Sequence, residues 1–503
     1  MNSISNGRQY MHNMGRMQND KQIEKEDQNI HNSSFPKLNQ SDEEFLSAYD
    51  AYFNRLEQAA KKQAILNHQN QAQQTGHTEE PKIFKREALD FVKATAALQT
   101  AEVWTAKPAA KGAKPVKKHK KLKRFAFILV ILASLYSLVV FSDIPFIAKW
   151  RTIYIETAMS TMNHQWLATA FFPDSVIEEV VQDRDNQQGL QSGMESDWSI
   201  SVYSKRSLYH TWNKAQKDFD TIYSEIDQAS FNAYLDAHGD EVIDDDGYLI
   251  IDQAGLSDGG TDIKTVYGDE VLAIDTYNAL SIIKIKGDGY VGRLAIIKDP
   301  SRVGVGLSED FGTKGALIGE ISQSNDAVLA VNASGFYDPD GHGDGGQVFG
   351  LVMQNGEVLN QALGGANKLV GFDSKNRLEI GSSQSSFRFR DAVEFKPALI
   401  VNGEVLVEGS AGWGIQPRTA IGQTKNGEVL LLIIDGRSPG YSIGCTVGEL
   451  AQILQRYGAY QACNLDGGSS SILYYNGREL SKPSAANKTL GRNIPDGFIV
   501  YNR

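Results

Sequence analysis

The apolar positions of this 503-residue chain follow three successive patterns. Residues 125–142 (FAFILVILASLYSLVVFS) form one continuous run, residues 152–235 carry mainly helical spacings, and short alternating runs begin near residue 240. Residues 1–40 are rich in Asn, Gln and Ser and poor in aliphatic side chains, which is typical of disorder. These patterns predict a partly disordered tail over residues 1–124, a transmembrane signal anchor over 125–147, a helical stalk over 148–239 and a sheet domain over 240–503.

The continuous apolar run has the length of a membrane span. At about 1.5 Å per residue, its ~18 residues extend roughly 27 Å as a helix. A buried core helix and a cleaved signal peptide are the alternatives, but about 120 residues precede the run and charged residues flank it. Nine Lys and Arg residues and no acids lie between Lys107 and Arg124, although the whole chain has a net charge of −11. The positive-inside rule therefore predicts a single-pass cell-membrane protein with a cytoplasmic N-terminus and an extracellular sheet domain.

The cytoplasmic tail contains two stretches with helical periodicity, at residues 42–66 and 86–104. They predict a small helical hairpin or a docking segment for a cytoplasmic partner within residues 41–104, and a lone amphipathic helix on the tail is an equal alternative. The basic strip at 107–124 lies directly against the apolar run, so we expect it to contact anionic lipid headgroups and not nucleic acid.

After residue 240, alternating runs such as LSIIKIKG, AVLAVNA and EVLLLIIDG are separated by Asn-Gly, Asp-Gly and Gly-Gly turns. Such runs and turns indicate strands joined by hairpins. One helix is expected inside this region, from Thr446 to Tyr457, with a capping box of Thr446 and Glu449 and a terminating Gly458. The fold class predicted is α+β, a mostly antiparallel sheet domain with few helices, preceded by the stalk and the single transmembrane helix.

Acids, arginines and glycine loops follow several of these apolar strands, where sites are commonly assembled. The loop NLDGGSSS at residues 464–471 offers consecutive backbone N–H groups, which can form an anion-binding nest. Arg418 and Arg437 could clamp a phosphate in bidentate fashion. Each motif alone also fits an ordinary turn or surface charge, but together they favour a phosphorylated, sugar-like substrate.

Two other features leave their chemistry open. Asp338, Asp340 and Asp344 in DPDGHGDGG suggest a calcium loop, but no glutamate follows at the twelfth position, so a flexible acidic turn is favoured over a divalent-cation site. Cys445 and Cys463 are compatible with a disulfide or with two small buried side chains, and their spacing does not indicate zinc. No cofactor is therefore expected with certainty.

Five motifs in the second half of the chain resemble those of the phosphodiester glycosidase family. In chain order they are NASGFYD at Asn332, PRTAIG at Pro417, IIDGRSPGYSIGCTVGELAQIL from Ile433, YGAYQACNLDGGSSSILYYNG from Tyr457, and RNIPDGFIVY at Arg492. The resemblance extends from about residue 268 to 503, and the membrane-anchored stalk also looks like bacterial members associated with exopolysaccharide biosynthesis. The chain departs from the family at residues 333–335, where a glycine pair is common, and at 467–468, where three glycines are frequent.

The resemblance implies cleavage of the bond between an anomeric carbon and a phosphodiester oxygen. A carboxylate would serve as nucleophile, base or electrostatic partner to the sugar, with Asp466 first, Asp435 second and Glu449 third. Glu449 is also explained by its capping box and Asp435 by an Asx-turn. The remaining residues expected at the substrate or its phosphate are Asn332, Gly335, Phe336, Arg418, Arg437, Asn464, Gly467, Gly468, Ser469, Ser470 and Arg492.

The resulting hypothesis is an extracytoplasmic enzyme that acts on a glycosyl-phosphate linkage in a cell-envelope glycan, an exopolysaccharide or a lipid-linked sugar. One alternative is a non-catalytic glycan-binding or scaffold protein of polysaccharide export. Another is a transglycosylase that uses the same site. The sequence does not separate hydrolysis from transfer.

Overall fold

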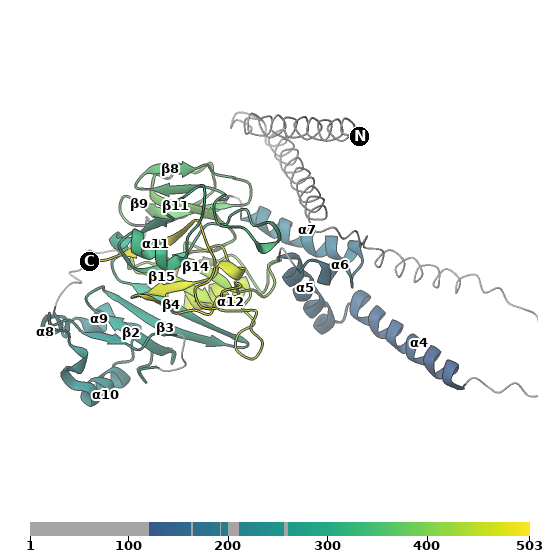
Figure 1. Ribbon diagram of the computed structural model, residues 1–503, viewed down its shortest axis with the longest axis horizontal. Coiled ribbons are helices and arrows are strands. Elements are labelled where there is room, and N and C mark those ends of the chain that lie inside the picture. The colour runs from purple at the N-terminus through teal and green to yellow at the C-terminus, as the bar shows by residue number, and fades with distance from the viewer. Residues whose placement is uncertain (1–119, 162–163, 192, 200–210, 256–259) are drawn as a thin grey trace, which may run out of the picture. The chain divides into compact units, whose positions relative to one another are not determined.

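The computed structural model describes residues 120–161, 164–191, 193–199, 211–255 and 260–503 (Figure 1). The periodic stretches predicted at residues 42–66 and 86–104 lie outside the described residues, so the hypothesis of a cytoplasmic partner stays a prediction.

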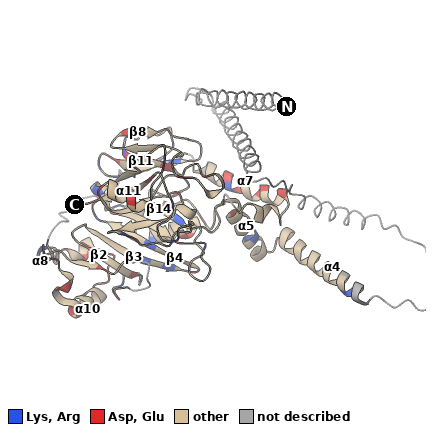
Figure 2. Ribbon diagram, in the orientation of Figure 1, with Lys and Arg blue, Asp and Glu red and all other residues tan. Residues whose placement is uncertain are grey.

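Helices precede the sheets. They are α4 (Lys120–Phe141), α5 (Pro145–Met159), α6 (Trp166–Thr169), α7 (Asp174–Leu190), α8 (Trp212–Ala215), α9 (Phe219–Ile222) and α10 (Gln228–His238). Figure 2 shows α4 without charged side chains beyond Arg124. Among the described residues, no single helix meets the length and hydropathy of a membrane span; α4 and α5, bent by 80° at their junction, meet both criteria only as a pair.

Three antiparallel sheets follow these helices. The nine-stranded sheet has the order β1-β2-β3-β4-β15-β14-β16-β12-β13. Its strands are β1 (Ile250–Asp252), β2 (Glu270–Asp275), β3 (Leu280–Gly287), β4 (Tyr290–Ile297), β12 (Ala398–Val401), β13 (Glu404–Val405), β14 (Arg418–Thr424), β15 (Val429–Ile434) and β16 (Ala459–Asn464). Short hairpin turns account for the antiparallel pairing of β2 with β3, β3 with β4, β12 with β13 and β14 with β15. The pairs β4–β15, β14–β16 and β12–β16 join segments that are distant in the sequence.

The two smaller sheets have five strands each, in the orders β10-β9-β11-β7-β8 and β18-β17-β6-β19-β5. The first contains β7 (Val352–Gln354), β8 (Glu357–Asn360), β9 (Lys368–Asp373), β10 (Leu378–Gly381) and β11 (Phe389–Phe395). The second contains β5 (Val303–Leu307), β6 (Ala327–Asn332), β17 (Leu473–Tyr475), β18 (Arg478–Glu479) and β19 (Asp496–Tyr501).

The main hydrophobic core collects buried side chains from all three sheets, and a second core lies between the nine-stranded sheet and α12 (Val447–Arg456). Within α12, Leu450, Ile453 and Leu454 face this second core, as the predicted apolar stripe requires. The mostly antiparallel α+β domain is thereby confirmed. A further helix, α11 (Ile318–Ser324), was not predicted, because its seven residues are too short for a clear periodic pattern.

The segment predicted as a stalk packs closely on the sheet domain. Phe219, Ile222 and Phe231 from α9 and α10 share a core with Val271 and Ile274 of β2. On α5, the Thr157 carbonyl accepts a hydrogen bond from the Gln416 side chain at 2.9 Å. The helices around residues 145–238 are therefore integrated with the sheets.

Candidate active site

The polar residues at the ends of β6 and β16 meet beside Asp466. The backbone N–H of Asp466 donates to the Ala333 carbonyl at 3.0 Å, and its carbonyl accepts from Asn332 Nδ2 at 2.7 Å. Asn332 is in turn fixed through Oδ1, which accepts from the Thr419 hydroxyl at 2.8 Å. These bonds join β6 and β14 to the loop after β16, so Asp466 has a rigid support.

The two glycines after Asp466 are required by close packing and backbone conformation. A Cβ on Gly467 would lie 2.8 Å from the Pro417 carbonyl oxygen. Gly468 has φ of +62°, in the left-handed region that favours glycine, and a Cβ there would lie 3.1 Å from Arg437 Nη2. The Asp-Gly-Gly sequence therefore permits a tight loop and brings a guanidinium to it.

The Asp466 side chain is partly exposed to solvent. Desolvation by the surrounding protein raises the pKa of Asp466 to about 7, although Ser470 and Arg492 act in the opposite direction. At neutral pH this carboxyl group is consequently present in both protonation states, which suits a group that exchanges protons or carries charge during a reaction.

Arg492 stands next to this carboxyl group and is held by several contacts. Its guanidinium forms a bidentate pair with Asp338, at 2.5 and 2.7 Å, and donates to the Ser469 hydroxyl at 3.1 Å. It also lies over the Phe336 ring, 4.7 Å from the centroid. Although burial raises it, Arg492 and the Gly343 N–H hold the pKa of Asp338 below its ordinary value. Asp338 thus serves as an ionised partner that positions Arg492.

Arg437 supplies the accessible positive charge of the site. Arg437 is exposed to solvent. Its guanidinium donates hydrogen bonds through Nη2 and Nε to Gln416 Oε1, at 2.7 and 3.2 Å. Its φ of +53° is uncommon for a non-glycine residue. No carboxylate is within ion-pair distance of Arg437 among the described residues, so its charge is open to a ligand.

The serine-rich loop provides fewer free backbone donors than the sequence suggested. The N–H of Gly468 donates to Pro417 at 2.9 Å, and that of Ser470 donates to Gly467 at 3.2 Å. Within the described part of the chain, an anion beside this loop would therefore rely on Arg437 and the Ser469 region more than on a row of amides.

Asp435, the second predicted carboxylate, has a different environment. It is buried, and its Oδ2 pairs with Arg293 at 3.0 Å and accepts from the Tyr441 hydroxyl at 2.8 Å. Its Oδ1 accepts from the Lys482 N–H at 2.8 Å. Burial raises the pKa of Asp435, against the effect of Arg293. Both oxygens are occupied by protein groups, so the geometry gives Asp435 a structural position.

Arg418 and Glu449 also differ from their predicted roles. Arg418 is buried and donates to the carbonyls of Trp413 and Gly414 at 2.8 Å, and burial lowers its pKa to about 10. Glu449 Oε2 accepts from the Thr446 N–H and hydroxyl, both at 2.8 Å. The first holds the backbone beneath the site, and the second completes the capping box of α12.

Two of the remaining predicted residues lie beneath the surface of the candidate active site. Gly335 and Asn464 are buried, and Asn464 Nδ2 donates to the Lys396 carbonyl at 2.8 Å.

The acidic loop considered for a cation has few described contacts. Asp344 Oδ1 accepts from the Gly346 N–H, and nothing is described for the Asp340 side chain. No group of three His, Cys, Asp or Glu side chains in the described ranges is placed to hold a metal ion. Cys445 and Cys463 are both buried and free.

Two contributors were missed from the sequence. Gln416 orients Arg437, and Asp496, at the start of β19, accepts from the Ser334 N–H at 2.8 Å. Burial raises the pKa of Asp496 to about 6. Asp496 lies in the motif RNIPDGFIVY and Gln416 opens the stretch QPRTAIG, which are the signals that could have marked them. The contact of Gln416 with Arg437, 21 residues away, has no signal in the sequence.

The sequence profile of the family described as phosphodiester glycosidase matches residues 325–501. This match confirms the resemblance over the stretch from the end of α11 to β19, which contains Asp466, Arg437 and Arg492.

Two curated relatives share limited stretches with the chain. It is 28% identical over 189 residues to the uncharacterized SPbeta prophage-derived protein YomE of Bacillus subtilis, covering 34% of this chain and 28% of that protein. It is 37% identical over 70 residues to N-acetylglucosamine-1-phosphodiester alpha-N-acetylglucosaminidase of Bos taurus, covering 14% of this chain and 13% of the bovine enzyme. The chain thus spans less than a third of either relative.

Two solved structures are similar at low identity. The catalytic domain of zebrafish N-acetylglucosamine-1-phosphodiester alpha-N-acetylglucosaminidase, auto-inhibited by its pro-peptide, has a TM-score of 0.38 and 20% identity, with 44% of this chain and 82% of that chain covered. A hypothetical protein from Synechocystis has a TM-score of 0.35 and 16% identity, with 47% and 64% covered.

Proposed function

We propose that this protein is a phosphodiester glycosidase that hydrolyses the bond between an anomeric carbon and a phosphodiester oxygen. The observation that carries the proposal is the position of Asp466 within the family-matched segment. It is a partly exposed carboxyl group on a rigid loop, with the open guanidinium of Arg437 close to the next turn of the same loop.

The chemistry fits this pair of charges. Cleavage of the bond between the anomeric carbon and oxygen releases a phosphomonoester, a weakly basic anion, so the departing oxygen needs little help from a general acid, and water supplies the hydroxyl that the sugar gains. Arg437 would stabilise the negative charge that develops on phosphate. Asp466, in its ionised form, would stabilise the positive charge on the sugar ring or attack the anomeric carbon. Arg492 would hold the loop in place through its hydrogen bond to the Ser469 hydroxyl.

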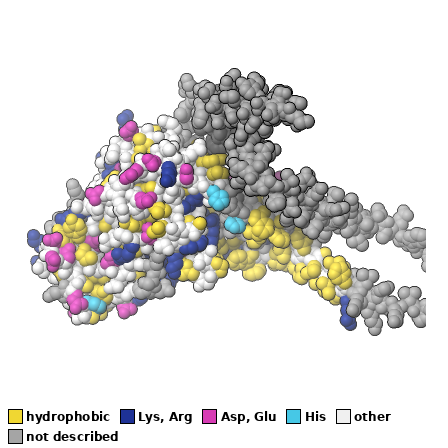
Figure 3. Space-filling view, in the orientation of Figure 1, with side chains coloured by type: hydrophobic (Ala, Val, Ile, Leu, Met, Phe, Trp, Pro, Cys, Tyr) yellow, Lys and Arg dark blue, Asp and Glu magenta, His cyan; other side chains and the backbone are white. Residues whose placement is uncertain are grey.

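The proposal includes a single-pass membrane anchor and a substrate in the cell envelope, either an exopolysaccharide or a lipid-linked sugar. Its support is the apolar surface of α4: Phe125, Phe127 and Leu132 are all more than half exposed, and Figure 3 shows hydrophobic side chains gathered along this helix. A lipid phase would cover such a surface. The basic strip at residues 107–124 supports a cytoplasmic N-terminus.

The test uses the full-length protein in detergent with UDP-N-acetylglucosamine and simple sugar-1-phosphodiesters, and release of free sugar is measured. The Asp466→Asn variant should lose at least a thousandfold in kcat/KM, because asparagine keeps the shape and removes the charge. Asp245→Asn changes an exposed acid outside the site and should leave the rate unchanged. Equal rates for wild type and Asp466→Asn would refute the assignment, and no release from any donor would refute the proposed activity.

A further inference from the structure

A cavity lies at the opposite ends of β14 and β16 from Asp466. The candidate active site follows the Asn464 end of β16, whereas the cavity lies at its Ala459 end and beside the β14–β15 hairpin. Because β14 has seven residues, the two places are separated by roughly 20 Å along the strands. The cavity has a volume of about 350 Å³, which suits a small polar ligand.

The floor of this cavity is a buried ion cluster. Lys298 Nζ pairs with Glu225 at 2.7 Å and with Glu428 at 3.3 Å. Glu225 also accepts from the Ser281 hydroxyl, and Glu428 accepts from the Thr424 hydroxyl at 2.9 Å. The cluster is internally satisfied, and Glu225 is buried within it. Glu428 is only partly buried, so it is the carboxylate of the cluster that a ligand's hydroxyl group can reach.

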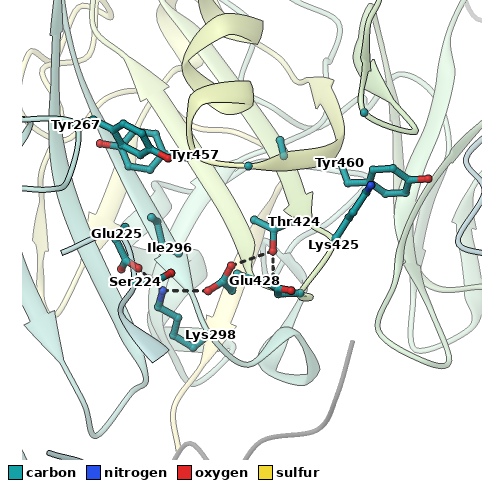
Figure 4. A pocket seen from close by; sticks show the side chains of 14 residues that line it. Ser224, Glu225, Tyr267, Ile296, Lys298, Thr424, Lys425, Glu428, Tyr457 and Tyr460 are labelled. Atoms are coloured by element: carbon teal, nitrogen blue, oxygen red, sulfur yellow. Dashed lines mark hydrogen bonds and ion pairs between the residues drawn. The ribbon is translucent and has the colours of Figure 1, made fainter. Parts of the chain in front are cut away.

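Tyrosine side chains line two sides of the cavity above this ion cluster. Figure 4 shows Tyr267 and Tyr457 on one side and Tyr460 with Lys425 on the other, with the ion cluster between them. Tyr267 is 49% exposed although its ring packs edge-on against Tyr457, with centroids 5.1 Å apart. The Tyr457 hydroxyl donates to Asp269 at 2.6 Å, and this bond holds the Tyr457 ring in position. An exposed tyrosine face over a polar floor suits a ligand with one apolar and one polar face.

The rim adds donors that the described protein does not use. The Asn426 side chain and the Ser224 hydroxyl are exposed, and within the described ranges neither forms a hydrogen bond. The charges of the lining cancel, since Lys298 and Lys425 balance Glu225 and Glu428. A neutral, polyhydroxylated ligand is favoured over an anion by this balance.

We propose that this cavity is a non-catalytic subsite that binds an uncharged sugar residue of a glycan chain. That the ligand is a glycan rests on the proposed function. The inference adds that the substrate is a polymer long enough to contact the protein at this cavity as well as at the cleaved bond. The ring face of the sugar would lie on Tyr267, while its hydroxyls would bond to Glu428 and Asn426. Binding at both places would raise the apparent affinity for long glycans.

The experiment measures binding of three uncharged tetrasaccharides, chitotetraose, cellotetraose and maltotetraose, to the full-length protein in detergent by calorimetry. At least one should bind, and Tyr267→Ala and Asn426→Ala should each weaken that binding at least tenfold. Asp466→Asn should bind it as wild type does. Tyr277→Ala, which removes a 36% exposed tyrosine outside the cavity, is the matched control and should have no effect.

Absence of binding to all three probes would overturn the subsite, as would unchanged binding in both Tyr267→Ala and Asn426→Ala. Loss of binding in Asp466→Asn would place the sugar at the active site instead. Hydrolysis of UDP-N-acetylglucosamine by the wild-type protein is followed in parallel. A failure of the proposed activity is then seen as missing hydrolysis, independently of tetrasaccharide binding.

Discussion

The loops that follow β15 and β16 both contain the dipeptide Asp-Gly, yet they place the two carboxyl groups in different environments. Asp435 after β15 is buried, with Arg293, Tyr441 and the Lys482 N–H on its oxygens. Asp466 after β16 is partly exposed and has no cation within ion-pair distance among the described residues. An acid at a strand end is therefore not sufficient to mark a chemical group, because the partners that reach it decide its role.

The largest effect on stability is expected from separating the buried pair. Arg293→Met leaves Asp435 buried without its cation, which should lower the free energy of unfolding by about 3–5 kcal/mol. Chemical denaturation measures this loss. Arg388→Met, at an exposed arginine, should change the stability by less than about 0.5 kcal/mol. A loss below about 1 kcal/mol in Arg293→Met would contradict the structural role of this pair.

The second prediction concerns the contribution of Arg437 to catalysis. Arg437→Gln keeps a non-glycine residue at the positive φ but removes the charge, so kcat/KM on a sugar-1-phosphodiester should fall about 100-fold, or ~2.7 kcal/mol of transition-state stabilisation. Arg388→Gln is the control for a general loss of positive charge. A decrease of less than threefold, in a variant that unfolds like wild type, would remove Arg437 from the phosphate site.

The raised pKa of Asp466 predicts a pH-dependent effect on stability. The folded protein keeps this proton until about pH 7, whereas the unfolded chain releases it near pH 4, so ionisation costs stability as pH rises between these values. Asp466→Asn should therefore increase the free energy of unfolding by about 2 kcal/mol at pH 8, an amount reduced for partial exposure. The gain should vanish at pH 4. A difference that is constant from pH 4 to pH 8 would show that the pKa is ordinary.

The smallest effect concerns Glu449, which the sequence offered as a third catalytic acid. Glu449→Ala removes one half of the capping box and should cost about 1 kcal/mol of stability, while Glu449→Gln should retain most of it. Hydrolysis by the folded protein should stay unchanged in both variants. An activity loss that glutamine does not restore would return Glu449 to the catalytic group.

Local patterns predicted local structure well. The run LSIIKIKG corresponds to β3 over Leu280–Gly287, and the capping box places α12 one residue inside the predicted helix at each end. The strand β14 was not predicted as such, since RTAIGQT has a glycine and polar residues that do not alternate clearly, and its pairing with β15 and β16 decides its structure.

The candidate active site was predictable only in part, because it too depends on contacts between residues that are distant in the sequence. Asp466 and its glycine loop stand in one motif, but Asp338 and Arg492 are 154 residues apart and meet only in the folded chain. The burial of Arg418 likewise depends on carbonyls of the preceding loop, which a count of charged residues does not show. Long-range packing determines which charges remain open to a ligand.

The most direct test of the account compares Asp466→Asn with Asp435→Asn, by measuring sugar release per folded molecule and the free energy of unfolding for both. The account predicts that Asp466→Asn is folded and inactive, and that Asp435→Asn is less stable but keeps activity within about tenfold of wild type in its folded fraction. A stable, inactive Asp435→Asn beside an active Asp466→Asn would contradict it and move the chemistry to the loop after β15.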